Sequence, residues 1–259
     1  MNNTADLIAS LSAEATPVKK ARTPCYWAVR LLALLALYAV GCQFFLGFRP
    51  DLGLQLTRPL FAVETLLLSL LLLSSAVAAV LAMYPDAYQK PHLLKLPYAI
   101  FALLVAAVGF QLLMPADTRM VMPEGAGVHA MECAICIASV ALVPSALIFA
   151  LLRKGASVRQ LQAGSFAVLA ASSIGCLTIR LAEANDSIMH LVQWHYVPTV
   201  LFAALGALAG KWLLKWQSYI ALDTARFNSG NISFSNHGFF FSQMLLRGLG
   251  CGSTSILGQ

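Results

Sequence analysis

Three side chains with metal-binding or redox chemistry lie near the start of one apolar segment, in the stretch HAMECAIC. His129, Cys133 and Cys136 stand there at positions i, i+4 and i+7, which share one face of a helix. Cys136 would lie about 10 Å deeper than His129, at a rise of about 1.5 Å per residue. Thiolate and imidazole groups bind zinc-like metal ions, and thiols also support redox chemistry. The spacing permits a metal or thiol site, whereas the default interpretation of these cysteines is a small buried apolar residue.

The elements that position these side chains are indicated by the composition. Of the 259 residues, 59% are hydrophobic and only 11% are charged, whereas soluble domains average about 45–50% and 25%. This composition indicates an integral membrane protein. The net charge of +6 comes from lysines and arginines beside the apolar runs, so we expect no direct nucleic-acid partner. The six cysteines lack the regular spacing of a secreted disulfide framework.

We predict an all-α fold, an integral membrane bundle of six transmembrane helices with a short cytoplasmic N-terminal amphipathic helix. Each span requires about 20 mostly apolar residues, and Pro-, Gly- and charge-rich connections separate the runs. The predicted spans are 27–47, 61–84, 97–114, 128–152, 161–181 and 190–214. The predicted divisions are a partner-binding segment at 1–24, the membrane domain at 25–216 and a poorly ordered tail at 217–259.

A second group of polar residues lies in RLAEANDSIMHLVQWHY, before and within the last predicted span: Arg180, Glu183, Asp186, His190 and His195. Six spans put this connection on the same side of the membrane as the start of the fourth span. One hypothesis is a metal ion that bridges His129 and Cys133 with His190 or His195. A Cys133–Cys136 disulfide would distort a regular helix, because Cβ atoms three residues apart are about 5–6 Å distant.

The distribution of basic residues predicts the orientation. Lysine and arginine favour cytoplasmic loops, and an N-terminus inside the cell gives that side eleven basic residues against Arg49, Arg58, Arg119 and Arg180 on the other. We therefore expect both termini in the cytoplasm. Ionisable residues within spans are expected near the span ends, where long side chains reach water; they are Arg30, Glu64, Arg153, Lys154, Lys211 and Lys215.

The polar N-terminal stretch predicts a short helix with one apolar face. Asp6 lies in its first turn, where the helix dipole favours an anion. Leu7, Ile8 and Leu11 share a face by their spacing. Such a short helix is marginal alone in water and requires a partner that accepts this face. A disordered leader is the alternative.

The sequence contains none of the common catalytic motifs in a suitable context, neither GxSxG, HExxH, a P-loop nor GxGxxG. We therefore expect no enzymatic activity and no cofactor, and leave metal ligation open. Gly206 and Gly210 form a GxxxG pattern that permits close helix contact. We interpret it as packing within the chain.

Several segments between residues 4 and 216 share their order and spacing with one known family. They are ADLIASLSAEATPVKK, GFRPDL, CAICI, VPSALIFALLRKGA, DSIMHLVQWHYVP and GALAGKWLLKW. On these segments the chain resembles the NrsF family of bacterial membrane anti-sigma factors. The resemblance implies a six-helix inner-membrane protein whose cytoplasmic N-terminal segment holds an extracytoplasmic-function sigma factor until stress releases it. The contacts it implies are Asp6, Leu7, Ile8 and Leu11.

The resemblance also bears on sensing. A cysteine early in the fourth span and another in the last outer loop are linked in that family to oxidant or metal stress. Cys133 matches the first, but Glu183 occupies the position expected for the second, and Cys176 lies about two turns earlier. The candidate sensing residues are therefore Cys133, Cys136, His129, His190 and His195. The alternative functions are a membrane thiol oxidoreductase, a small-solute transporter and a structural membrane subunit.

Overall fold

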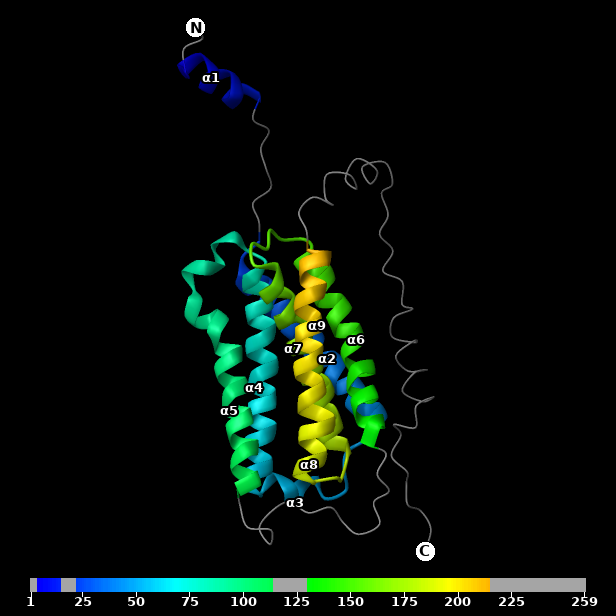
Figure 1. Cartoon of the computed structure of the whole chain (residues 1–259). Helices are drawn as coiled ribbons and strands as arrows, with labels where there is room; N and C mark the ends of the chain where they lie inside the picture. Colours follow the sequence, from blue (N-terminus) through cyan, green and yellow to red (C-terminus); the bar gives the residue numbers. More distant parts are fainter. Residues whose placement is uncertain (1–3, 15–21, 114–129, 215–259) are drawn as a thin grey trace, which may run out of the picture.

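The chain folds into a bundle of long helices (Figure 1). The structure, a computed structural model, describes residues 4–14, 22–113 and 130–214. Within them the α-helices are α1 (Thr4–Glu14), α2 (Pro24–Leu46), α3 (Leu52–Leu56), α4 (Pro59–Ala82), α5 (Pro91–Leu113), α6 (Ala130–Leu152), α7 (Gln160–Ala182), α8 (Ile188–His190) and α9 (Val197–Leu213). A 3-10 helix covers Pro85–Gln89, and a π-helix covers Leu191–Tyr196 between α8 and α9.

Six helical segments are long and apolar enough to cross a membrane, as predicted. They are α2, α4, α5, α6, α7 and the continuous run Ile188–Leu213. Five of the six begin and end within three residues of the predicted bounds. The predicted tail at 217–259 lies outside the described residues, and the three predicted divisions of the chain stay predictions.

The predicted start of the third span at residue 97 was wrong, because α5 already begins at Pro91. Proline suits the first helical position, where its missing N–H would have no partner in any case. Pro97 lies inside the helix and removes only the bond to the carbonyl of Leu93. Leu94 and Ile100 are buried on either side of it, so apolar packing holds the helix across the missing bond.

Helix α7 lies at the centre of the bundle and packs against α9, α4, α6 and α2. Small residues fill its buried faces, among them Ala167, Ala170 and Ala171. Ser172 and Ser173 are buried, and their hydroxyls donate to carbonyls one turn earlier, those of Val168 and Leu169. The central helix therefore carries buried serines without leaving these two hydroxyls unsatisfied.

Helices α7 and α9 lie in close contact at three glycines. A Cβ atom added to Gly164 would lie 2.2 Å from the carbonyl oxygen of Gly206 and 2.7 Å from the Cα of Gly210. No side chain fits in that space, so the GxxxG pattern packs within the chain. This confirms the prediction of internal packing.

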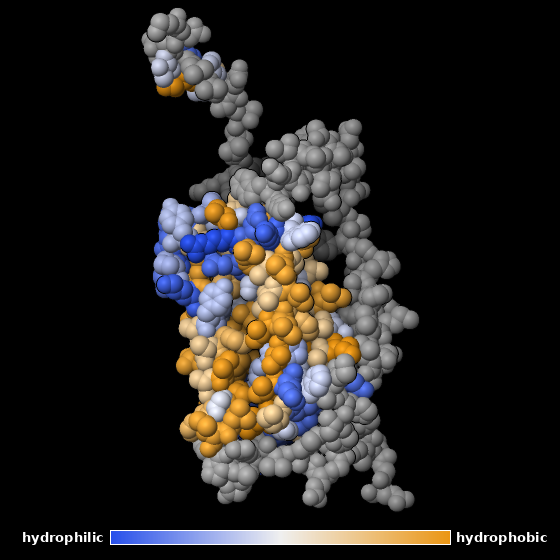
Figure 2. Space-filling model, viewed as in Figure 1, coloured by the Kyte–Doolittle hydropathy of each residue, from blue (hydrophilic) through white to orange (hydrophobic). Residues whose placement is uncertain are grey.

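The bundle has two ends, which we name by the elements there. The terminal end carries the start of α2, the 3-10 helix and the end of α9, and the α3 end carries α3, α8 and residues 183–187. Figure 2 shows an apolar band along the side of the bundle, with hydrophilic side chains gathered near the terminal end. Exposed side chains on the bundle include Leu37, Phe44 and Trp212, at 71%, 84% and 74% exposure. Such a surface suits lipid and not water.

Candidate functional site

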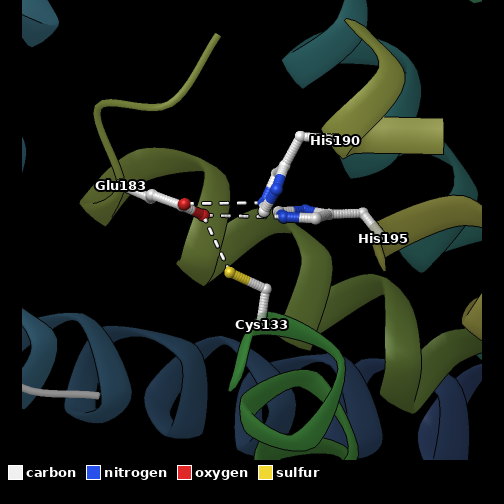
Figure 3. Close-up of side chains that lie close together, drawn as sticks. All are labelled: Cys133, Glu183, His190 and His195. Carbon is white, nitrogen blue, oxygen red and sulfur yellow. Dashed lines mark hydrogen bonds and ion pairs between the residues drawn. The ribbon is translucent and has the colours of Figure 1, made fainter. Parts of the chain in front are cut away.

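Four side chains with ligand atoms converge at the α3 end of the bundle (Figure 3). The Sγ atom of Cys133, a carboxylate oxygen of Glu183 and one ring nitrogen each of His190 and His195 all lie within 4.8 Å of one another. The Cys133 thiol donates to Glu183 Oε2 at 3.3 Å. Nε2 of His190 lies 3.5 Å from Glu183 Oε1, and Nε2 of His195 lies 3.6 Å from Oε2. We call these four residues the Cys–Glu–His cluster.

Three chain segments supply the cluster. Cys133 lies in the first turn of α6, and Glu183 follows the last residue of α7 with extended backbone, φ −89° and ψ 137°. His190 ends α8, and His195 lies in the π-helix. Side chains five residues apart diverge by about 140° on an α-helix, at 3.6 residues per turn. The wider π-helical turn brings both histidines toward the same carboxylate (Figure 3).

The sequence explains where the π-helix ends. Pro198 has no N–H, so the carbonyl of Trp194, four residues earlier, lacks the partner that an α-helix would give it. The backbone therefore changes its bonding pattern just before Pro198, and α9 begins at Val197. This local change is what makes His195 available to the cluster.

The cluster is mostly excluded from solvent. The side chains of His190 and His195 are 7% and 2% exposed, and that of Glu183 is 28% exposed. Burial alone would raise the pKa of Glu183, but the rings of His190 and His195 outweigh it and hold that pKa below its usual range. Glu183 is therefore a carboxylate at neutral pH, and with Cys133 it forms the partly exposed side of the cluster.

The structure brings together some of the predicted sensing residues and not others. Cys133 meets both His190 and His195, where the sequence predicted one histidine or the other. Cys136 packs into the apolar core of the bundle and lies outside the cluster, so its role in sensing stays a prediction. His129 lies outside the described residues. The predicted sigma-binding residues are on α1, where Ile8 is 61% exposed and Asp6 is exposed; the side chains of Leu7 and Leu11 lie outside the description.

Cys176 does not replace the missing second cysteine. Its Sγ atom lies 3.1 Å from Thr199 Oγ1 and 3.7 Å from the carbonyl oxygen of His195, in the core of the bundle. Cys133 and Cys176 are both free thiols. Among the described cysteines no second thiol joins Cys133 in the cluster. Glu183 takes the place of the second cysteine, as its position in the sequence indicated.

A network of buried ion pairs lies beside the cluster, and the sequence did not predict it. Arg180 donates to Asp186 Oδ1 at 2.7 Å and to both carboxylate oxygens of Glu64 at 3.2 Å. The hydroxyl of Tyr196 also donates to Glu64. Arg49 donates to Asp186 Oδ1 and Oδ2, each at 2.9 Å. The network therefore ties the end of α2 to α4, α7 and residues 183–187.

The expectation that Glu64 reaches water was wrong, since this residue is only 1% exposed. Its charge is compensated by Arg180, which is equally buried. The guanidinium of Arg180 also stacks 4.6 Å from the ring of Phe61. The sequence contained a usable signal, namely opposite charges near the ends of two spans at the same end of the bundle, with Glu64 near the start of one and Arg180 near the end of the other. Arg30, Arg153, Lys154 and Lys211 are exposed, as predicted.

The charges of the network shift the pKa values of its loop residues. Burial alone would raise the pKa of Asp186, but hydrogen bonds from Arg49 and Arg180 outweigh it and lower that pKa. Hydrogen bonds from Arg49 likewise hold the pKa of Asp51 well below its usual range. Both aspartates are therefore ionised at neutral pH and compensate the arginines.

Known proteins were compared with the chain at the level of families, curated sequences and solved structures. No curated protein and no solved structure matches it. One family model does match, NrsF, described as negative regulator of sigma F, and it covers residues 11–216. The match spans α2 to α9, with both the Cys–Glu–His cluster and the ion-pair network. The chain therefore belongs to the NrsF family of negative regulators of sigma F.

Proposed function

We propose that the chain is an anti-sigma factor of the bacterial inner membrane. Its N-terminal segment holds an extracytoplasmic-function sigma factor at the membrane and releases it on a stress signal. The family match over residues 11–216 carries this proposal. The chain acts by binding and has no enzymatic activity of its own.

The placement in the membrane is supported by the six long apolar helices and by the charges at their ends. On the α3 end, Arg49 and Arg180 are neutralised by buried ion pairs with Asp186 and Glu64. On the terminal end, exposed lysines and arginines remain available, among them Lys90, Lys154 and Lys211. This asymmetry favours a cytoplasmic terminal end, where the N-terminal segment would meet a sigma factor.

Helix α1 is the proposed contact with the sigma factor. It is 11 residues long, too short to be stable alone in water. Its exposed Ile8 and the Leu7 and Leu11 positions on the same face suit an apolar groove on a partner. Asp6, in the first turn, adds a charge that a basic partner surface can pair.

Helix α2 offers a direct route from the α3 end to α1. The backbone N–H of Arg49, just after α2, donates to the carbonyl of Leu181 at 3.0 Å, and its side chain holds Asp186. The other end of α2 begins at Pro24, directly after the N-terminal segment. A rearrangement of residues 181–186 would therefore move α2 itself. Reversing a 99:1 population requires about 5.5 kcal/mol of bias, so the switch must be a discrete rearrangement.

Co-purification tests the contact. The full chain, purified from membranes of its host in mild detergent, is expected to carry a protein with sigma-factor sequence, identified by mass spectrometry. The double variant Leu7→Asp with Leu11→Asp should lose it, because the apolar face then carries two charges. The double variant Ala9→Asp with Ala13→Asp is the matched control, since it adds the same charges on the opposite, exposed face.

The two variants separate a lost contact from a lost helix. Aspartate is a poorer helix former than either residue it replaces, and the loss relative to alanine is the larger one. A sigma factor retained by the control and lost from the leucine variant supports the proposed face. Retention by the leucine variant would rule that face out.

A further inference from the structure

The Cys–Glu–His cluster has the donor set of a transition-metal site. We propose that Cys133, Glu183, His190 and His195 bind one divalent metal ion of the zinc class, through the Cys133 thiolate, a Glu183 oxygen and Nε2 of each histidine. This inference goes beyond the proposed sigma-factor function and does not rest on it.

The distances from Cys133, His190 and His195 to the Glu183 carboxylate fall in the range of tetrahedral coordination. Zinc bonds of about 2.0–2.1 Å to nitrogen or oxygen and 2.3 Å to sulfur give ligand-to-ligand distances of about 3.3–3.8 Å. Cys133 Sγ and His195 Nε2 lie 3.3 Å and 3.6 Å from Glu183 Oε2, and His190 Nε2 lies 3.5 Å from Glu183 Oε1. The two nitrogen–oxygen distances exceed ordinary hydrogen-bond lengths of about 2.7–3.2 Å. The donors are thus spaced for an ion between them.

A second, independent observation is the state of the two imidazole rings. Nε2 of His190 and Nε2 of His195 are buried, and neither has a hydrogen-bond partner among the described residues. The two residues are only 8% and 2% exposed, and both rings point toward Glu183 (Figure 3). An unsatisfied buried polar atom costs about 1–3 kcal/mol. A metal ion would give both nitrogens a partner at once.

The chemistry of the donors selects the class of ion. One thiolate and two imidazoles favour zinc and similar borderline ions, whereas Mg²⁺ and Ca²⁺ prefer sites made only of oxygen. A thiolate and a carboxylate carry two negative charges, which balance a divalent ion in the poorly solvated bundle. Binding therefore releases one proton from the Cys133 thiol to solvent. The 28% exposure of Glu183 gives the ion a path from the α3 end.

Cobalt(II) is the probe for this site, because it replaces zinc and is visible. The full chain is purified in detergent, freed of any affinity tag, treated with a chelator and titrated with Co²⁺. We expect one ion per chain, a thiolate-to-cobalt charge-transfer band in the near ultraviolet and intense tetrahedral bands in the visible. Zn²⁺ should abolish these bands at one equivalent, and excess Mg²⁺ should not.

Single variants test the ligands. Cys133→Ser should remove the charge-transfer band, and Glu183→Gln or His195→Asn should lower the affinity for Zn²⁺ by at least about 10-fold. Cys25→Ser is the control, because Cys25 is an exposed thiol at the terminal end of the bundle, far from the cluster at the α3 end. This variant should leave the spectrum unchanged. Far-ultraviolet circular dichroism confirms that each variant is folded.

Two results would overturn the proposal. The first is the absence of a charge-transfer band from the unaltered chain with Co²⁺ in excess, which needs no variant to interpret. The second is a band that persists at full intensity in folded Cys133→Ser protein. The site is supported if one ion binds per chain with the thiolate band, and if Cys133→Ser removes that band while Cys25→Ser leaves it unchanged.

Discussion

Arg49 and Asp186 form an ion pair with two parallel hydrogen bonds of 2.9 Å between the end of α2 and the loop after α7. The side chains are 1% and 8% exposed, although the two residues lie 137 positions apart in the chain. Asp186 also accepts a bond of 2.7 Å from Arg180. One carboxylate therefore holds two buried arginines and fixes the loop that carries Glu183.

We expect Asp186→Asn to destabilise the chain by about 3–5 kcal/mol, because it leaves two buried arginines without this counter-charge. Asp51→Asn is the matched control, since Asp51 also pairs with Arg49 but its side chain is 39% exposed. Its expected loss is below about 1 kcal/mol. Unfolding of both variants in detergent, followed by circular dichroism, gives the comparison. Equal losses would show that burial does not set the strength of these pairs.

The same carboxylate predicts a dependence on pH. The pKa of Asp186 in the folded chain lies below its ordinary value of 3.8, so the ionised form stabilises the fold. This contribution is present in full above about pH 4 to 5 and decreases as the pH falls through the lower folded pKa. The difference in Tm between the unaltered chain and Asp186→Asn should therefore shrink below about pH 4. A difference that grows on acidification would contradict the assigned sign.

The contact of α7 with α9 predicts the effect of one methyl group. Gly164→Ala places a Cβ atom 2.2 Å from the carbonyl oxygen of Gly206, so the helices must separate, at about 1–3 kcal/mol. In Gly109→Ala the added Cβ meets nothing within 4 Å, and this control should be neutral or slightly stabilising. Thermal unfolding in detergent measures both. A Gly164→Ala chain as stable as the control would refute the close contact.

The orientation is testable with a thiol reagent that does not cross membranes. Cys25 is exposed at the terminal end, and a Thr57→Cys substitution adds an exposed thiol at the α3 end. We expect labelling of position 57 in intact spheroplasts and of Cys25 only after lysis, with the labelled peptides identified by mass spectrometry. The opposite pattern would place the termini outside the cytoplasm.

Much of the bundle follows from sequence because lipid leaves few alternatives. A run of about 20 apolar residues must form a helix to satisfy its backbone, and the six predicted runs correspond to the six long helices. The early start of α5 was missed because Pro97 was taken as a boundary. Packing against neighbouring helices overrides the single lost hydrogen bond there.

The site was predicted only in part, for two physical reasons. The meeting of His190 and His195 depends on a π-helix, and helical periodicity read from sequence assumes 3.6 residues per turn. The burial of Glu64 depends on Arg180 in another span, and no single-segment pattern contains that partner. Glu183 was identified by position, yet its contact with Cys133 required the fold of the loop after α7.

The most direct test of the proposed function is the sign of regulation in the host. Deleting the chain should raise the transcripts that depend on its co-purifying sigma factor, because a negative regulator has been removed. The unaltered chain and the Ala9→Asp, Ala13→Asp variant should restore the low level, and the Leu7→Asp, Leu11→Asp variant should not. Transcripts that fall or stay unchanged on deletion would contradict the account.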